Sequence, residues 1–157
     1  MKRFYSYLFI ATVGLLGLVS CSSDDNSTPE KKEVDPIVGK WELKTMDLKI
    51  YENGEVYLEF EDESVEGLLV FEFDFKEDNT VDFTSGNLNQ SGEMETNSET
   101  GTYVKNEDSV TITIEGEPET FSILKLNSSE LHLFVTDEYS SGEMEYIDEI
   151  TFKMVKM

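Results

Sequence analysis

The sequence predicts an all-β fold, an antiparallel up-and-down barrel of about eight strands. From Ile37 to the C-terminus, apolar residues alternate with polar ones at a period of two, which is typical of strands with one buried face. Short polar segments rich in Gly, Asn, Asp and Ser separate these runs, as hairpin turns do, and no window has the apolar spacing of a helix. A sheet with one apolar face has to cover that face, and closure into a barrel does so.

The expected strands follow one another at near-regular spacing. The clearest is LLVFEFDFK, in which Leu69, Phe71, Phe73 and Phe75 share one face while acidic residues and a lysine share the other. The remaining expected strands lie around residues 41–43, 56–60, 81–83, 101–104, 110–114, 121–126, 131–135 and 144–155. Hairpin connections between neighbours make the pairing antiparallel. The expected turns lie at residues 53–54, 77–79, 106–108, 116–118, 127–129 and 140–142.

Two segments leave alternatives open. Ser85–Thr100 is the longest polar interruption, and it is either a mobile loop or an extension of a hairpin. In the last run, Asp148 and Tyr146 have the parity of the apolar residues. Either Asp148 points into the barrel, or a bulge at residues 147–149 resets the register, and we predict the bulge. If Asp148 points inward, it and Tyr146 are the first polar candidates for a ligand pocket.

The residues expected to face inward are bulky. The aromatic ones are Trp41, Phe60, Phe71, Phe73, Phe75, Phe83, Phe121 and Phe152. Such rings fill a small barrel, whereas a drug-sized ligand needs a pocket of roughly 300 Å³ or more. The sequence therefore favours a narrow or absent cavity, with weak or no binding of small apolar molecules.

The N-terminus has the pattern of a secretory signal. Lys2 and Arg3 precede the apolar run Leu8–Val19, which is shorter than the roughly 20 residues of a membrane-spanning helix. The end of this run, LVSC, resembles a bacterial lipobox. That resemblance implies removal of residues 1–20 and attachment of a diacylglyceryl group and further acyl chains such as palmitate to Cys21. Several acyl chains on one residue make a stable membrane anchor.

The four residues after the cysteine are Ser22, Ser23, Asp24 and Asp25. An acidic pair at this place resembles the export signal of surface lipoproteins of Bacteroidetes, which implies display on the outer face of the outer membrane. An anchor that faces the periplasm is the alternative. Residues 21–36 have no periodic apolar pattern and are expected to form a flexible acidic tether. Residues 37–157 then form one domain.

Charge and composition exclude several classes of function. The net charge is −22, and removal of the signal with its two basic residues makes it two units more negative, which disfavours binding to nucleic acid. Lipidation of Cys21, the only cysteine, leaves no thiol for a disulfide or a zinc site. His132 has the parity opposite to Leu131 and Leu133, so we expect it to point outward. We identify no catalytic residue, no metal ligand and no cofactor-binding motif.

A family resemblance is carried by Gly39-Lys40-Trp41 and by three later segments, GTY at 101–103, SVTI at 109–112 and SELHL at 129–133. Their order and spacing resemble lipocalins, in particular the lipocalin-like lipoproteins of Bacteroidetes. The resemblance implies a barrel in which Trp41 packs at the closed end against an Arg of the final strand. The only arginine is Arg3, in the signal, so Lys153 and Lys156 are the candidates for that place.

Together these features predict a monomeric, non-enzymatic binding or interaction module on the outer membrane, without a cofactor and with an unknown ligand. One alternative is a carrier of a small apolar ligand. Another is a protein that binds glycans or processes surface polysaccharide, because the many carboxylates leave two-carboxylate glycosidase chemistry open. A protein partner and weak Ca²⁺ binding at the acidic residues 61–63 and 137–138 also stay open.

Overall fold

The computed structural model describes residues 34–157, which form nine strands and no helix. The strands are β1 (Gly39–Glu52), β2 (Glu55–Ser64), β3 (Leu69–Phe75), β4 (Thr80–Leu88), β5 (Met94–Lys105), β6 (Ser109–Ile114), β7 (Glu117–Leu126), β8 (Glu130–Ser141) and β9 (Met144–Lys156). Every pairing is antiparallel. Within this part of the chain, no helix is long and apolar enough to cross a membrane.

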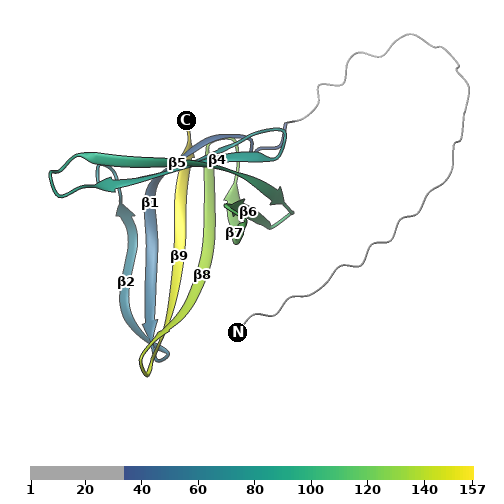
Figure 1. The fold of residues 1–157 in the computed structure, drawn as a ribbon. Helices are drawn as coiled ribbons and strands as arrows, with labels where there is room; N and C mark the ends of the chain where they lie inside the picture. The colour runs from purple at the N-terminus through teal and green to yellow at the C-terminus, as the bar shows by residue number, and fades with distance from the viewer. Residues whose placement is uncertain (1–33) are drawn as a thin grey trace, which may run out of the picture. The chain divides into compact units, whose positions relative to one another are not determined.

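Eight of the strands close a barrel, which confirms the predicted fold class. The order in the sheet is β2-β1-β3-β4-β5-β6-β7-β8-β9, and β9 pairs again with β1 (Figure 1). The first residues of β1 pair with β3, and the last residues of the same edge pair with β2. β2 pairs with no other strand of residues 34–157, so it lies outside the closed ring. Phe60, expected inside, is therefore 44% exposed.

The core lies at one end of the barrel, which we call the closed end. It contains Ile37, Trp41, Leu43, Val65, Phe73, Phe75, Val81, Tyr103, Val110, Ile112, Phe121, Leu131, Leu133 and Met154. Phe73, Phe75, Phe121 and Tyr103 make edge or tilted ring contacts with centroids 4.9–6.3 Å apart. Since every one of these residues lies in 37–154, the domain has its own core.

The register of the last strand contradicts one prediction. β9 pairs continuously with β8 from Glu130↔Val155 to Ser141↔Met144, so the bulge predicted at residues 147–149 is wrong. The bulge lies in β1 instead, at Lys44, where two residues oppose one of β9. It moves the inward parity of β1 from Trp41 and Leu43 to Met46 and the even-numbered residues after it.

Ser85–Thr100 is the hairpin extension, one of the two alternatives. β4 and β5 pair from Thr80↔Thr102 to Leu88↔Met94, and the turn closes with the Asn89 N–H donating to the Glu93 carbonyl at 2.8 Å. In Figure 1 this hairpin runs across the ends of β1, β8 and β9. The turn between β1 and β2 is Asn53-Gly54, as predicted, and both residues have positive φ, as hairpin turns of two residues require.

The predictions for the signal, for Cys21 and for the acidic residues 22–25 lie outside the described residues.

Candidate functional site

Burial falls steadily along the inward faces of the strands, and this gradient creates the candidate site. On β8, Leu131 and Leu133 are fully buried, Val135 is half-buried and Asp137 is exposed. β9 follows the same course from the buried Met154 to the half-buried Phe152 and Ile150. Because the strands run on beyond the core, the inner faces of their far halves line an open mouth. We call this the open end.

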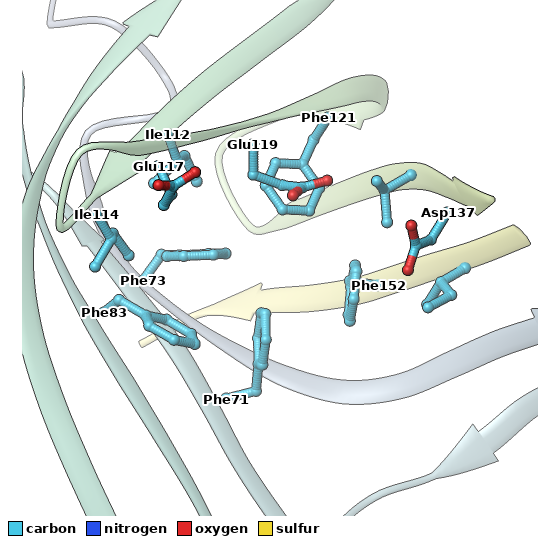
Figure 2. A pocket seen from close by; sticks show the side chains of 12 residues that line it. Phe71, Phe73, Phe83, Ile112, Ile114, Glu117, Glu119, Phe121, Asp137 and Phe152 are labelled. Atoms are coloured by element: carbon cyan, nitrogen blue, oxygen red, sulfur yellow. The ribbon is translucent and has the colours of Figure 1, made fainter. Parts of the chain in front are cut away.

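A cavity of about 370 Å³ lies at the open end (Figure 2). Its lining residues are Phe71, Phe73, Phe83, Ile112, Ile114, Glu117, Glu119, Phe121, Val135, Asp137, Ile150 and Phe152. The rings of Phe71 and Phe152 are stacked at 4.9 Å, and Phe83 meets Phe71 edge-on at 5.0 Å. The volume lies within the range of small-molecule sites, which begins at roughly 300 Å³.

The expectation of a narrow or absent cavity is therefore wrong. The sequence correctly predicted which aromatic residues of the closed barrel face inward. Among them are Phe71, Phe73 and Phe152, whose side chains line the cavity. A narrow or absent cavity would require those rings to meet across the barrel axis along its whole length. Phe73 and Phe121, from β3 and β7, do meet across the barrel at 6.3 Å, whereas Phe71 and Phe83 pack edge-on against each other on the paired strands β3 and β4 and line the cavity.

Three carboxylates face this cavity, and none of them was predicted from the sequence to line a pocket. Glu117 and Glu119 lie on β7 in the parity of Phe121, and Asp137 lies on β8 in the parity of Val135 (Figure 2). The signal that would have found them is the same period of two, followed past the last apolar residue of each strand. Beyond that residue the inward positions are acidic, so a hydrophobic pattern does not mark them.

Asp148 and Tyr146 lie on the inward face of β9, in register with Asp137 and Tyr139 of β8. The Tyr139 and Tyr146 rings stack at 5.2 Å, and both border a polar hollow beside the β8–β9 turn rather than the aromatic cavity. One carboxylate oxygen of Asp148, Oδ1, is buried and has no hydrogen-bond donor within the part of the chain that the structure describes. Burial, together with the nearby Asp148 carboxylate, raises the pKa of Tyr139.

The closed end holds Gly39 and Trp41. Trp41 is fully buried, and its indole Nε1–H donates to the Ile37 carbonyl at 2.7 Å. Lys156 Nζ lies 4.9 Å from the centre of the Trp41 ring, so Lys156, and not Lys153, occupies the place that the family resemblance assigns to an arginine. Gly39 has φ of +129°, and a Cβ there would lie 2.6 Å from Lys156 Cε.

Lys153 points to the outer face instead. Its ammonium donates to Asp47 Oδ1 at 2.8 Å and also to Asp62. Burial alone would raise the pKa of Asp47, but hydrogen bonds from the Asp62 N–H and from Lys153 outweigh it, so that pKa lies below its ordinary value. His132 is half-buried on this outer side, where burial and the cations of Lys125 and Lys153 lower its pKa.

The lining suits an apolar ligand better than a metal ion or a sugar. No three His, Cys, Asp or Glu side chains within residues 34–157 are grouped so as to hold a metal ion. Carboxylates beside aromatic rings are one requirement of glycosidase chemistry. However, no lining side chain donates a hydrogen bond from nitrogen, and no Tyr or Trp lines the cavity to stack on a sugar ring. The apolar floor dominates what this cavity can bind.

Comparison with known proteins shows which family the chain belongs to. The family described as "Lipocalin-like domain" matches residues 37–133, which is more than half of the chain. The chain belongs to the lipocalin-like domain family. This confirms the resemblance drawn from Gly39-Lys40-Trp41 and the later segments. No curated protein matches the sequence.

Solved structures similar to this lipocalin-like domain include bacterial and animal proteins. A lipocalin-like protein from Bacteroides uniformis has 16% identity over 78% of this chain and 99% of its own, with a TM-score of 0.42. An uncharacterised protein from Bacteroides eggerthii has 18% identity over 76% and 98%, with a TM-score of 0.43. Bovine odorant binding protein, in complex with a selenium-containing odorant, has 17% identity over 85% and 78%, with a TM-score of 0.46.

The family match ends inside β8, at residue 133. Val135, Asp137, Ile150 and Phe152 of the cavity therefore lie beyond the matched segment.

Proposed function

We propose that this lipocalin-like domain binds a small apolar ligand in the cavity at its open end. The observation that carries the proposal is a cavity of about 370 Å³ in which nine of twelve lining residues are apolar. A ligand that fills it removes phenylalanine, isoleucine and valine surface from water. At roughly 25 cal/mol for each Å² of apolar surface, this burial supplies the driving force.

The test is a titration of residues 22–157, which contain the whole core, with a lipophilic dye and a panel of fatty alcohols. We expect saturable binding, with the better members near 1 μM, or roughly 8 kcal/mol. A dye is the better reporter because Trp41 lies in the core at the closed end, away from the cavity lining.

The matched variants are Val135→Trp and Val104→Trp. Val135 lines the cavity, so a larger side chain fills it, whereas Val104 is 64% exposed and is not among the lining residues. We expect Val135→Trp to abolish dye binding while the protein stays folded by circular dichroism, and Val104→Trp to bind normally. Equal binding by both variants, or no saturable binding by the unsubstituted domain, refutes the proposal.

We also propose that the domain is anchored to the outer membrane through lipid on Cys21 and is displayed on the cell surface. The support is the lipobox-like LVSC and the acidic residues Asp24 and Asp25 that follow it. Cys21→Ala is expected to abolish fatty-acid labelling and membrane retention. Protease added to intact cells is expected to remove the domain, and Asp24→Ala with Asp25→Ala to protect it without loss of anchoring. Protection of the unsubstituted protein would place it in the periplasm.

A further inference from the structure

The rim of the cavity is acidic and has no counter-charge. Glu117, Glu119 and Asp137 all line it, and none of the twelve lining residues is basic (Figure 2). Among residues 34–157, no lysine makes an ion pair with any of the three. The lysines of the outer face pair with carboxylates of that face, as Lys49 does with Glu59 and Lys153 with Asp47.

A further carboxylate, that of Asp148, lies on the strand next to Asp137. Asp137 lies directly opposite Asp148 in the β8–β9 register, and like charges at such a position destabilise a sheet. Asp148 Oδ1 is buried, and no donor among residues 34–157 makes a hydrogen bond to it. Asp148 is not among the lining residues, so this pair adds negative charge next to Asp137 rather than a contact with the ligand.

The negative charge of the rim favours some of the ligands whose apolar part fits the cavity over others. A fatty acid would bring a carboxylate to a rim of carboxylates, where like charges repel. A neutral ligand gains nothing from the rim. A metal ion would need a group of three or more ligating side chains, and the described residues contain no such group. A molecule with a positively charged head and an apolar body would place its head beside the rim carboxylates and its body on the apolar floor.

We propose that the cavity is selective for cationic amphiphiles, that is, amines or quaternary ammonium compounds with an apolar body. This inference rests on the proposed binding function and names its ligand class. The body lies among Phe71, Phe121 and Phe152, and the head lies at the rim among Glu117, Glu119 and Asp137. Phenylalanine faces next to the rim also attract a cation. The net charge of −22 raises the local concentration of cations around the whole protein.

The test compares three ligands with the same ten-carbon chain and different heads. Decyltrimethylammonium, decanol and decanoate are titrated by calorimetry into residues 22–157, below their micelle concentrations and at low salt. We expect the cation to bind about tenfold more tightly than decanol and decanoate to bind more weakly still, since each exposed ion pair is worth about threefold in affinity. Added salt is expected to remove this preference.

Matched variants separate the rim from the charge of the whole protein. Glu117→Gln with Glu119→Gln and Glu61→Gln with Glu63→Gln each remove two negative charges, the first pair at the rim and the second on β2. We expect the rim variant to lose about tenfold in cation affinity and to bind decanol unchanged, and the β2 variant to retain the preference.

The outcomes are distinct. Binding of decanol without any preference for the cation refutes the inference and leaves the proposed function standing. An equal loss of preference in both variants also refutes it, because the selectivity would then come from net charge alone. If none of the three ligands binds, both the inference and the proposed function fail.

Discussion

Replacing Trp41 with Ala tests the closed end, on which the rest of the barrel depends. The side chain is fully buried among the core residues, and removal of a buried aromatic costs about 3–5 kcal/mol. The hydrogen bond from Nε1 to the Ile37 carbonyl adds about 1 kcal/mol. The expected loss is therefore about 4–6 kcal/mol, out of a total of about 5–15 kcal/mol for a domain of this size.

The assay is urea unfolding of residues 22–157 followed by far-ultraviolet circular dichroism, which does not need the tryptophan as a probe. Trp41→Phe serves as the companion variant, because it keeps an aromatic ring but removes the N–H donor. It is expected to cost about 1–2 kcal/mol, much less than Trp41→Ala. A loss below about 1 kcal/mol for Trp41→Ala would contradict the packing described for the closed end.

Two further predictions concern positions near the ends of the first and last strands. Gly39→Ala is expected to destabilise the domain by about 1–3 kcal/mol in the same assay, because φ of +129° disfavours an L-residue and the new Cβ meets Lys156; unchanged stability would show that the strand shifts freely. Asp47 has a lowered pKa in the folded state, so its contribution to stability is complete above the unfolded pKa of about 3.9 and is lost as pH falls through the lower folded value. We expect Asp47→Asn to flatten the unfolding free energy against pH in that acidic range, and a profile identical to that of the unsubstituted domain would refute the role of Lys153 and the Asp62 N–H.

The period of two in the sequence predicted the strands, the turns and the closed end, since fully buried residues are apolar and leave a clear pattern. It did not predict the open end, where inward residues include Glu117 and Asp137. The strands there keep the same alternation, but hydrophobicity no longer indicates which residues face inward, because the inward residues Glu117, Glu119 and Asp137 are exposed.

The sequence also did not predict where the regular pairing of the strands is interrupted. The parity conflict at Asp148 suggested a bulge in β9, whereas the structure has a bulge at Lys44 of β1 and leaves Asp148 inward. A bulge depends on both strands of a pair, so one strand alone does not locate it. Likewise, only the three-dimensional register distinguishes Lys156, over Trp41, from Lys153 on the outer face.

The position of β2 outside the closed ring has a consequence for how copies of this protein behave beside one another. An edge strand is a template on which another chain can add, and crowded copies are at greatest risk of such aggregation. β2 carries five carboxylates in ten residues, and Asp62 has φ of +52° where its pairing with β1 is irregular. Repulsion between acidic edges therefore keeps neighbouring copies apart. Acidification that neutralises these carboxylates is expected to turn the same edge into a site of self-association, with light scattering rising before the core unfolds.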